Sequence, residues 1–156
     1  MTEDDLDDAI HALGVRVEYV DLPPDRDGEY LHHRRLIRLQ RGMATRLRRC
    51  VKAHELAHAI FRDVTSKFGP VNAKAERRAD EWAALRLIPL AAYKRAEILH
   101  GGHMGAMAVE IDVTTDLLEV YRAMLFVVED EKGVRTYVKP GMGDGQWSAR
   151  ELTWVP

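Results

Sequence analysis

The stretch Ala53-His-Glu-Leu-Ala-His-Ala-Ile-Phe61 decides the structure of this 156-residue chain, because it holds an HExxH motif. At about 3.6 residues per turn, an α-helix places His54 and His58 one above the other on a single face. Two imidazoles in this arrangement can chelate one metal ion. Glu55 lies about 100° further round the helix, where it can act as a general base on a water at that ion.

A catalytic zinc site normally has three protein ligands and a water, so a third ligand is expected. In one known arrangement it follows in the same segment, which would need glycine and histidine where this chain has Phe61 and Val64. The alternative is Glu76, which lies 18 residues after His58 in a second helical segment. The simpler interpretation of Glu76 is a solvated charge that pairs with the neighbouring arginines.

Asp80 lies one helical turn after Glu76, so the two carboxylates share a face. Glu76 can then bind the metal while Asp80 accepts a hydrogen bond from a ligand histidine. Glu81 lies about 140° from Glu76 round the helix axis and is not expected to take part. The predicted zinc site therefore has three ligands and one supporting carboxylate, namely His54, His58, Glu76 and Asp80.

Local patterns predict a small sheet before this motif and further helices after it. The expected strands are residues 15–20, 29–32 and 35–39, with two more candidates at 134–138 and 152–155. The expected helices are residues 2–13, 43–62, 72–88 and 90–99, and one that begins at Thr114 or Thr115. Residues 66–71 are expected to be a loop, with Asn72 as the cap of the next helix. We therefore expect an α+β fold with the sheet packed on the HExxH helix.

Composition predicts one soluble domain over residues 1–156. A hydrophobic content of 46% is sufficient for a single core, and the net charge of -2 gives no overall preference for nucleic acid or anionic membranes. Cys50 is the single cysteine, so no intrachain disulfide can form. The acidic start lacks the features of a signal peptide, and the apolar run 123–128 is too short to cross a bilayer. These features predict a cytoplasmic location.

Three motifs follow one another in a fixed order: His54-Glu-Leu-Ala-His58, Glu76-Arg-Arg-Ala-Asp80-Glu-Trp-Ala83 and Leu87-Ile-Pro89. Together they resemble the ImmA/IrrE family of metallopeptidases, and residues 108–124 look like the trailing helices of that family. The resemblance covers about residues 15–125 and leaves the role of the tail, residues 133–156, open. It implies a zincin-like fold of the gluzincin type, with Glu76 as the third zinc ligand. It also implies cleavage of a helix-turn-helix transcriptional repressor of a mobile element or stress response.

Two other functions compete with this interpretation. The chain could be a catalytically silent zincin that binds a repressor, although an intact Glu55 has no use in a purely structural site. It could instead be a DNA-binding regulator, because residues 31–53 hold eight cations and no acid: Arg34, Arg35, Arg38, Arg41, Arg46, Arg48, Arg49 and Lys52. The simpler interpretation is a solvated face balanced by the acidic first helix, so direct nucleic-acid binding is not expected.

Several other residues carry weaker signals. An oxyanion donor besides the metal is usual in peptidases, and Tyr93, His100 and His103 are candidates, none of which is preferred over a packing role. Cys50 is expected to be a buried thiol. His32 and His33 are expected to be exposed at the hairpin turn.

Overall fold

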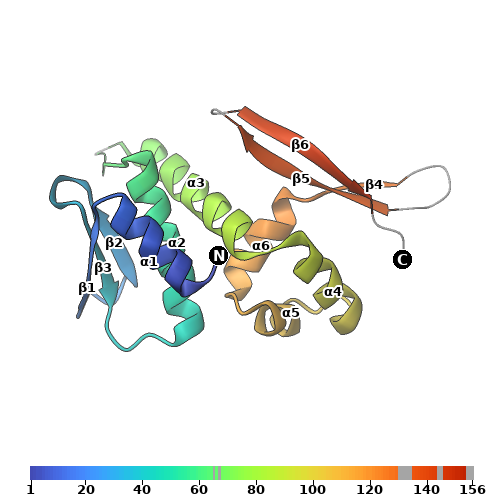
Figure 1. Ribbon diagram of the computed structural model, residues 1–156, viewed down its shortest axis with the longest axis horizontal. Helices are drawn as coiled ribbons and strands as arrows, with labels where there is room; N and C mark the ends of the chain where they lie inside the picture. Colours follow the sequence, from blue (N-terminus) through green and yellow to red (C-terminus); the bar gives the residue numbers. More distant parts are fainter. Residues whose placement is uncertain (65, 67, 130–134, 144–145, 154–156) are drawn as a thin grey trace.

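The computed structural model describes residues 1–64, 66, 68–129, 135–143 and 146–153, and it has an α+β architecture (Figure 1). A small sheet lies at one end of the molecule, α2 and α3 cross the middle, and the later helices lie beyond them. The helices are α1 (Glu3–Ala12), α2 (Thr45–Phe61), α3 (Gly69–Leu87), α4 (Leu90–His100), α5 (Met104–Ile111) and α6 (Thr115–Met124). The expected α+β arrangement, with the sheet packed on the HExxH helix, is confirmed.

The first helix begins where the sequence predicts. The Asp5 backbone N–H donates to the Thr2 hydroxyl at 3.1 Å, and the Thr2 N–H donates to the Asp5 carboxylate at 2.6 Å. This reciprocal pair satisfies two backbone donors that a helix start otherwise leaves without partners. Leu6 and Ile10 then bury the inner face of α1 in the core.

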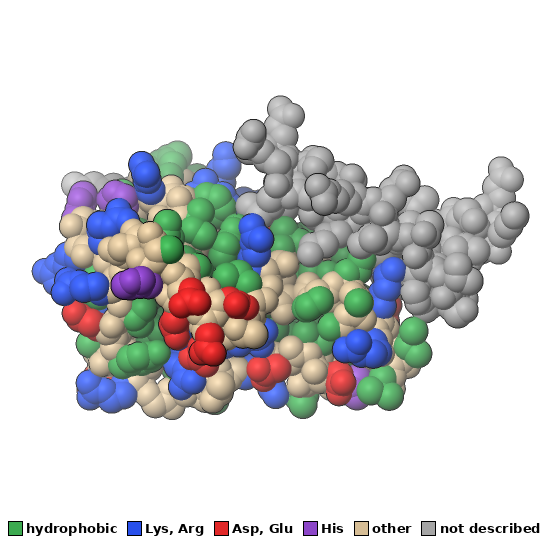
Figure 2. Space-filling view, in the orientation of Figure 1, with side chains coloured by type: hydrophobic (Ala, Val, Ile, Leu, Met, Phe, Trp, Pro, Cys, Tyr) green, Lys and Arg blue, Asp and Glu red, His purple; other side chains and the backbone are tan. Residues whose placement is uncertain are grey.

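Charged groups also hold α1 on α2. Lys52 is 1% exposed, and its ammonium lies 3.1 Å from Glu3 and 2.7 Å from Asp7. Arg48, one turn earlier on α2, binds the same Glu3 carboxylate at 2.8 Å. Part of the basic stretch is thus neutralised by the acidic first helix, as expected. Figure 2 shows acidic side chains gathered near the N-terminal end of α1, with Lys and Arg side chains around them.

The N-terminal sheet has the strand order β1-β3-β2, so β3 is central and β2 is an edge strand. Its strands are β1 (Arg16–Val20), β2 (Gly28–Leu31) and β3 (Leu36–Gln40). β1 runs parallel to β3, whereas β2 and β3 form the predicted antiparallel hairpin. A short 3-10 turn, η1 (His32–Arg34), closes that hairpin, and Arg35 reverses the chain with a positive φ of 46°. His33 is exposed as expected, whereas His32 is half-buried.

The start of α3 differs from the expectation. The helix begins at Gly69, with Pro70 in its first turn, so the predicted loop 66–71 is too long and Asn72 is not the cap. Proline at a helix start has the required φ and lacks an N–H that would be unpaired there. Asn72 instead exchanges hydrogen bonds with the backbone of Ser66, at 2.9 Å and 2.8 Å, and so closes the connection from α2.

A second difference is α5, which begins in a Gly- and Met-rich stretch where local patterns predicted no helix, although its last residues fall within the 108–124 segment that resembles the family's trailing helices. His103 accepts a hydrogen bond from the Ala106 N–H at 3.2 Å and caps this helix, and Asp112 ends it with a positive φ of 60°. Met107 and Ala108 are buried, so tertiary packing stabilises a segment in which Gly105 disfavours a helix. The helix of residues 115–124 begins after Thr114, whose hydroxyl accepts from the Leu117 N–H as predicted.

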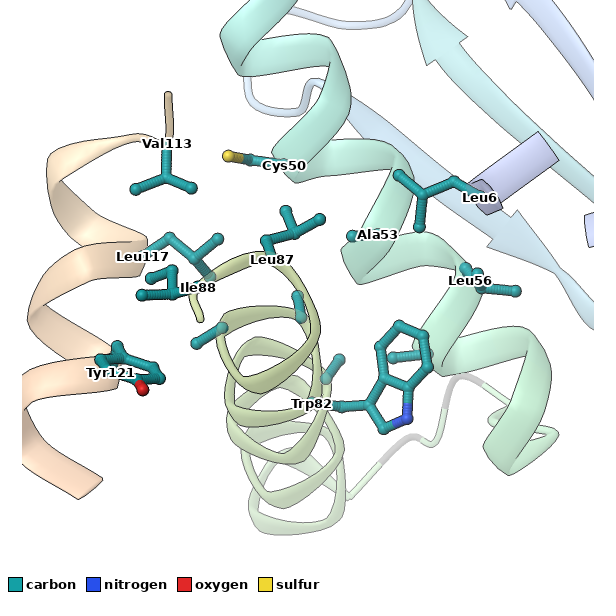
Figure 3. Close-up of a cluster of buried hydrophobic side chains, with 14 of the residues drawn as sticks. Leu6, Cys50, Ala53, Leu56, Trp82, Leu87, Ile88, Val113, Leu117 and Tyr121 are labelled. Atoms are coloured by element: carbon teal, nitrogen blue, oxygen red, sulfur yellow. The ribbon is translucent and has the colours of Figure 1, made fainter. Parts of the chain in front are cut away.

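The core lies where α3 passes between α2 and α6 (Figure 3). Small residues on α2 and α3, including Ala53, Ala57, Ala79 and Ala83, are fully buried and let the helices approach closely. Trp82, Leu87 and Tyr121 fill the space around them. The two helices that carry the HExxH and Glu76 motifs are therefore held by a shared core.

After α6, a second antiparallel sheet has the order β4-β5-β6, with β4 (Phe126–Glu129), β5 (Arg135–Gly143) and β6 (Gln146–Thr153). The strand expected at 134–138 overlaps β5, and the strand expected at 152–155 overlaps β6. Residues 134, 154 and 155 lie outside the described residues. Among the described residues, no helix is long and apolar enough to cross a membrane.

Candidate metal centre

Three side chains from two helices converge on one point. His54 and His58 project from α2, and Glu76 projects from α3 beside it. The two Nε2 atoms lie 2.9 Å apart, and Glu76 places one carboxylate oxygen 3.1 Å from His54 Nε2 and the other 3.6 Å from His58 Nε2. Each residue contributes one donor atom, and these three atoms all lie within 4.8 Å of one another. The structure thus brings together the three residues that the sequence predicted as ligands.

Each histidine is oriented by a carboxylate on its other nitrogen. His54 Nδ1 lies 2.7 Å from Asp80, which is the partner that the sequence predicted for a ligand histidine. His58 Nδ1 lies 2.9 Å from Asp63, a residue that the sequence analysis missed. Because an ionised carboxylate only accepts hydrogen bonds, both Nδ1 atoms carry protons and both Nε2 atoms face the centre.

Asp63 reaches His58 because the chain reverses at the end of α2. Arg62 adopts a left-handed conformation with a φ of 57°, and the Asp63 N–H donates back to the His58 carbonyl at 3.0 Å. The second Asp63 oxygen accepts a hydrogen bond from Arg78 on α3, whose guanidinium lies 4.1 Å from the centre of the Phe61 ring. The sequence signal for this contact was an acidic residue just after the last turn of the HExxH helix.

The donor set fits a cation. With protons on both Nδ1 atoms, neutral His54 and His58 direct two lone pairs at each other and at the Glu76 carboxylate, an arrangement that needs a positive charge at its centre. Burial opposes charging of the rings, yet hydrogen bonds with Asp80 and Glu76 raise the pKa of His54 to about 10, and Glu76 and Asp63 likewise raise the pKa of His58. The same hydrogen bonds lower the pKa of Glu76. Two imidazoles and a carboxylate are a common ligand set for Zn²⁺.

Glu55 lies beside this set, wedged between α2 and the edge strand β2. Its side chain is nearly buried, and burial raises the pKa of its carboxyl. A Cβ atom on Gly28 would lie 2.9 Å from Glu55 Oε1 and 2.6 Å from Val51 Cγ1, so only glycine leaves room at this position. The sequence analysis did not identify Gly28, because the requirement comes from side chains of α2, a helix more than 20 residues further along the chain.

A model of the IrrE N-terminal-like domain, Peptidase_M78, matches residues 10–119. The chain belongs to this family. The match confirms the expected ImmA/IrrE relationship, and its bounds lie close to the expected 15–125. A search of curated proteins found no match. A solved structure of a Mycobacterium tuberculosis transcriptional regulator is similar in fold, with a TM-score of 0.55 and 16% identity, covering 96% of this chain and 50% of that one. The chain thus spans about half the length of that regulator.

In this IrrE-like domain, two members of the donor set, His58 and Glu76, line an open cleft of about 300 Å³. One wall is the whole of β2, residues 28–31, and the floor includes Glu55, His58 and Glu76. A second hollow of about 310 Å³ shares Glu55 and Glu76 with this cleft and is lined by His54 as well. Its walls include the apolar side chains of Leu47 and Val120. An extended peptide laid along β2 would therefore pass directly over Glu55.

The other candidates lie away from this cleft. Tyr93 is buried in the IrrE-like core, His103 caps α5, and His100 lies 3.9 Å from Glu110. None of the three lines the cleft, so the structure does not support them as oxyanion donors. Cys50 is 6% exposed, which confirms the expected buried thiol, and burial raises its pKa.

Most of the basic stretch is engaged within the domain. Arg46 and Arg49 bind the Asp112 carboxylate at 3.4 Å and 3.1 Å. Arg41 lies 3.6 Å from Asp21, and Arg35 donates to the carbonyls of residues 13 and 14. These contacts support the interpretation that the basic stretch is balanced internally.

Proposed function

We propose that this chain is a zinc-dependent metallopeptidase with a zincin-like site of the gluzincin type. The observation that carries the proposal is the convergence of His54, His58 and Glu76 beside Glu55 in a cleft bounded by an edge strand. Such a ligand set leaves a coordination position open for catalysis. Family membership supports a peptidase-type domain.

The residues take distinct roles in this proposal. Zn²⁺, when bound, supplies Lewis acidity toward water and the peptide carbonyl. Glu55 accepts a proton from the attacking water and passes it to the leaving amine. Its raised pKa supports this role, because a carboxylate with a higher proton affinity is a stronger base near neutral pH. Asp80 and Asp63 hold the two imidazoles with Nε2 toward the centre.

The shape of the cleft supports an extended peptide as substrate. β2 pairs with β3 on one side only, so its other edge has backbone groups to offer to a further strand. All four residues of β2 line the cleft. A substrate segment that adds to this edge would place its backbone over the donor set without a deep pocket.

We further propose that the substrate is a helix-turn-helix repressor of a mobile element or stress response, cut at one or a few sites in the cytoplasm. The support is the family relationship, together with the similarity in fold to a protein described as a transcriptional regulator. The alternative is a silent zincin that binds a repressor without cutting it. The support for that alternative is the burial of Glu55, because a side chain that is 5% exposed is reached by substrate and water only through the cleft. The internal ion pairs of the basic stretch weigh against a DNA-binding regulator.

One experiment separates these functions. The zinc-loaded protein is incubated with the repressor encoded beside it and, separately, with casein, and the products are identified by mass spectrometry. The proposal expects discrete repressor fragments that disappear with Glu55→Gln, which cannot accept the proton but retains the size of the side chain. Glu81→Gln is the matched control on α3 and should still cut. Stable repressor binding without fragments would favour the silent zincin, and broad casein digestion with an intact repressor would contradict the substrate assignment.

A further inference from the structure

The cleft continues past the end of β2 into a further hollow that the proposed mechanism does not use. This hollow has a volume of about 560 Å³ and shares Leu31 and Asp63 with the cleft, so the two are continuous. The rest of its wall consists mainly of nitrogen-bearing side chains: His32, His33, Arg34 and Arg38.

The hairpin places these groups together. η1 presents His32, His33 and Arg34 in succession immediately after β2 ends. Arg38 comes from the adjacent strand β3 and is held by the carboxylate of Glu29, its register partner on β2. The hollow therefore adjoins the same edge strand that bounds the cleft. The guanidinium of Arg38 is fixed in place by Glu29.

The charges of the hollow are unbalanced. Its single carboxylate, Asp63, is engaged by His58 through one oxygen and by Arg78 through the other. Arg34 is exposed and forms no ion pair with any side chain among the described residues. The wall thus offers N–H donors and an uncompensated positive charge, and its one carboxylate is already engaged.

We propose, building on the peptidase function, that this basic hollow is a specificity subsite for an acidic side chain of the peptide substrate. His32 and Arg34 lie four and six residues along the chain from Gly28, which lies beside Glu55. Each residue of an extended strand advances about 3.3 Å. A peptide paired with β2 brings an Asp or Glu side chain into the hollow about two to five residues from the scissile bond. The guanidinium of Arg34 binds its carboxylate.

A peptide fits this hollow better than a nucleic acid does. Duplex DNA typically requires about six to ten phosphate contacts for tight binding, spread over an extended surface. The basic stretch beyond the hollow is tied to Glu3, Asp7 and Asp112, which leaves few cations for a phosphate backbone. One hollow beside a strand edge instead matches one side chain of an extended chain.

The first test maps cleavage preference. A peptide library derived from a digested proteome is given separately to three zinc-loaded proteins: the wild type, Arg34→Glu and the control Arg16→Glu. Arg16 is an exposed arginine on the opposite edge strand, β1. Wild type and the control should enrich Asp and Glu at one position within about five residues of the cut bond. Arg34→Glu should lose that enrichment and lower kcat/KM for acidic peptides about fivefold, with zinc content unchanged. Equal enrichment in all three proteins, or none in the wild type while it cuts, would overturn the proposal.

The second test does not depend on turnover. Zinc-loaded Glu55→Gln protein is titrated with a pair of capped hexapeptides that differ by one Glu or Gln, and with a 12-base-pair duplex, while backbone amide NMR shifts are followed. Saturable shifts at residues 31–34 that occur with the Glu peptide alone, and that are lost in Arg34→Glu, would support the subsite. This result would hold even if the wild type cleaves no peptide, in which case the peptidase proposal alone would fail. No difference between the Glu and Gln peptides, or shifts at these residues with the duplex alone, would overturn the subsite.

Discussion

His58 Nδ1 lies 2.9 Å from the Asp63 carboxylate, which makes Asp63 the counterpart of Asp80 on the other ligand histidine. The two acids come from different places. Asp80 lies on α3, whereas Asp63 lies in the turn that ends α2. Each imidazole of the candidate metal centre is therefore oriented by a carboxylate on its Nδ1 nitrogen.

Asp63→Ala should weaken zinc binding about 10- to 100-fold, because His58 loses the partner that fixes its tautomer and ring orientation. Asp63→Asn should lose less, since the amide oxygen can still accept the hydrogen bond. Competition with a chromophoric chelator gives the Kd, and ¹⁵N shifts of the His58 ring report its tautomer. Unchanged affinity and an unchanged tautomer in Asp63→Ala would limit Asp63 to a structural role.

Replacements on α3 should follow an order. Glu76→Ala removes a donor atom and should lower zinc affinity most, Asp80→Ala should lower it about 10- to 100-fold, and Glu81→Ala should leave it nearly unchanged. Zinc titration calorimetry measures all three. A larger loss for Glu81→Ala than for Glu76→Ala would reassign the third ligand.

Purified protein should carry about one zinc per chain, and His58→Ala should remove it. Because the metal binds the folded state, a chelator should lower the Tm of the wild type, and zinc at about 100 times its Kd should add about 2.7 kcal/mol of stability. Elemental analysis and thermal unfolding provide the measurements. A wild type that carries no zinc, and whose Tm is indifferent to both additions, would remove the basis of the proposed function.

Gly28→Ala should disturb the site through packing alone. The added Cβ would lie 2.6 Å from Val51 Cγ1 and 2.9 Å from Glu55 Oε1, so either the strand or both side chains must move. We expect a loss of about 1–3 kcal/mol in the free energy of unfolding, and a fall in kcat larger than the change in zinc affinity. Adding Val51→Ala should recover part of the stability but little of the activity. Wild-type kcat in Gly28→Ala would show that Glu55 tolerates displacement.

The contact of α1 with α2 should depend on pH. Hydrogen bonds from Arg48 and Lys52, opposed by partial burial, lower the pKa of Glu3 from 4.5 to about 2. A lowered carboxyl pKa stabilises the folded state above the unfolded pKa, and this stability is lost as pH falls from about 5 toward 2. Glu3→Gln should therefore cost about 1 kcal/mol at pH 7, a figure reduced for partial exposure, and progressively less below pH 4. Urea unfolding of both proteins at pH 7, 4 and 3 tests this, and a constant difference would contradict it.

Much of the site follows from helical periodicity within short segments. The spacing of His54 and His58, and of Glu76 and Asp80, places each pair on one face whatever surrounds the helix. The Thr2 and Thr114 caps are equally local, since each bonds an amide three residues away. For the same reason, predictions from the sequence were wrong where local signals were weak. α5 forms through burial of Met107 and Ala108 despite Gly105, and α3 begins at Gly69 rather than after Asn72.

By itself, the sequence determined the family, most of the helices and strands, and the three residues that converge at the candidate metal centre, because motifs on regular helices specify their own faces. The contact of Asp63 with His58 arises from the chain reversal that ends α2, and an acid five residues after the histidine was its local signal. Only the tertiary structure decided that Gly28 admits Glu55 beside the edge strand, and that Arg34 stands at the end of the cleft. These two relationships bring the β2–β3 hairpin together with α2 or with the turn after it, more than 20 residues away in the chain. Their geometry depends on how α2 packs against the sheet and α3, which no local pattern encodes.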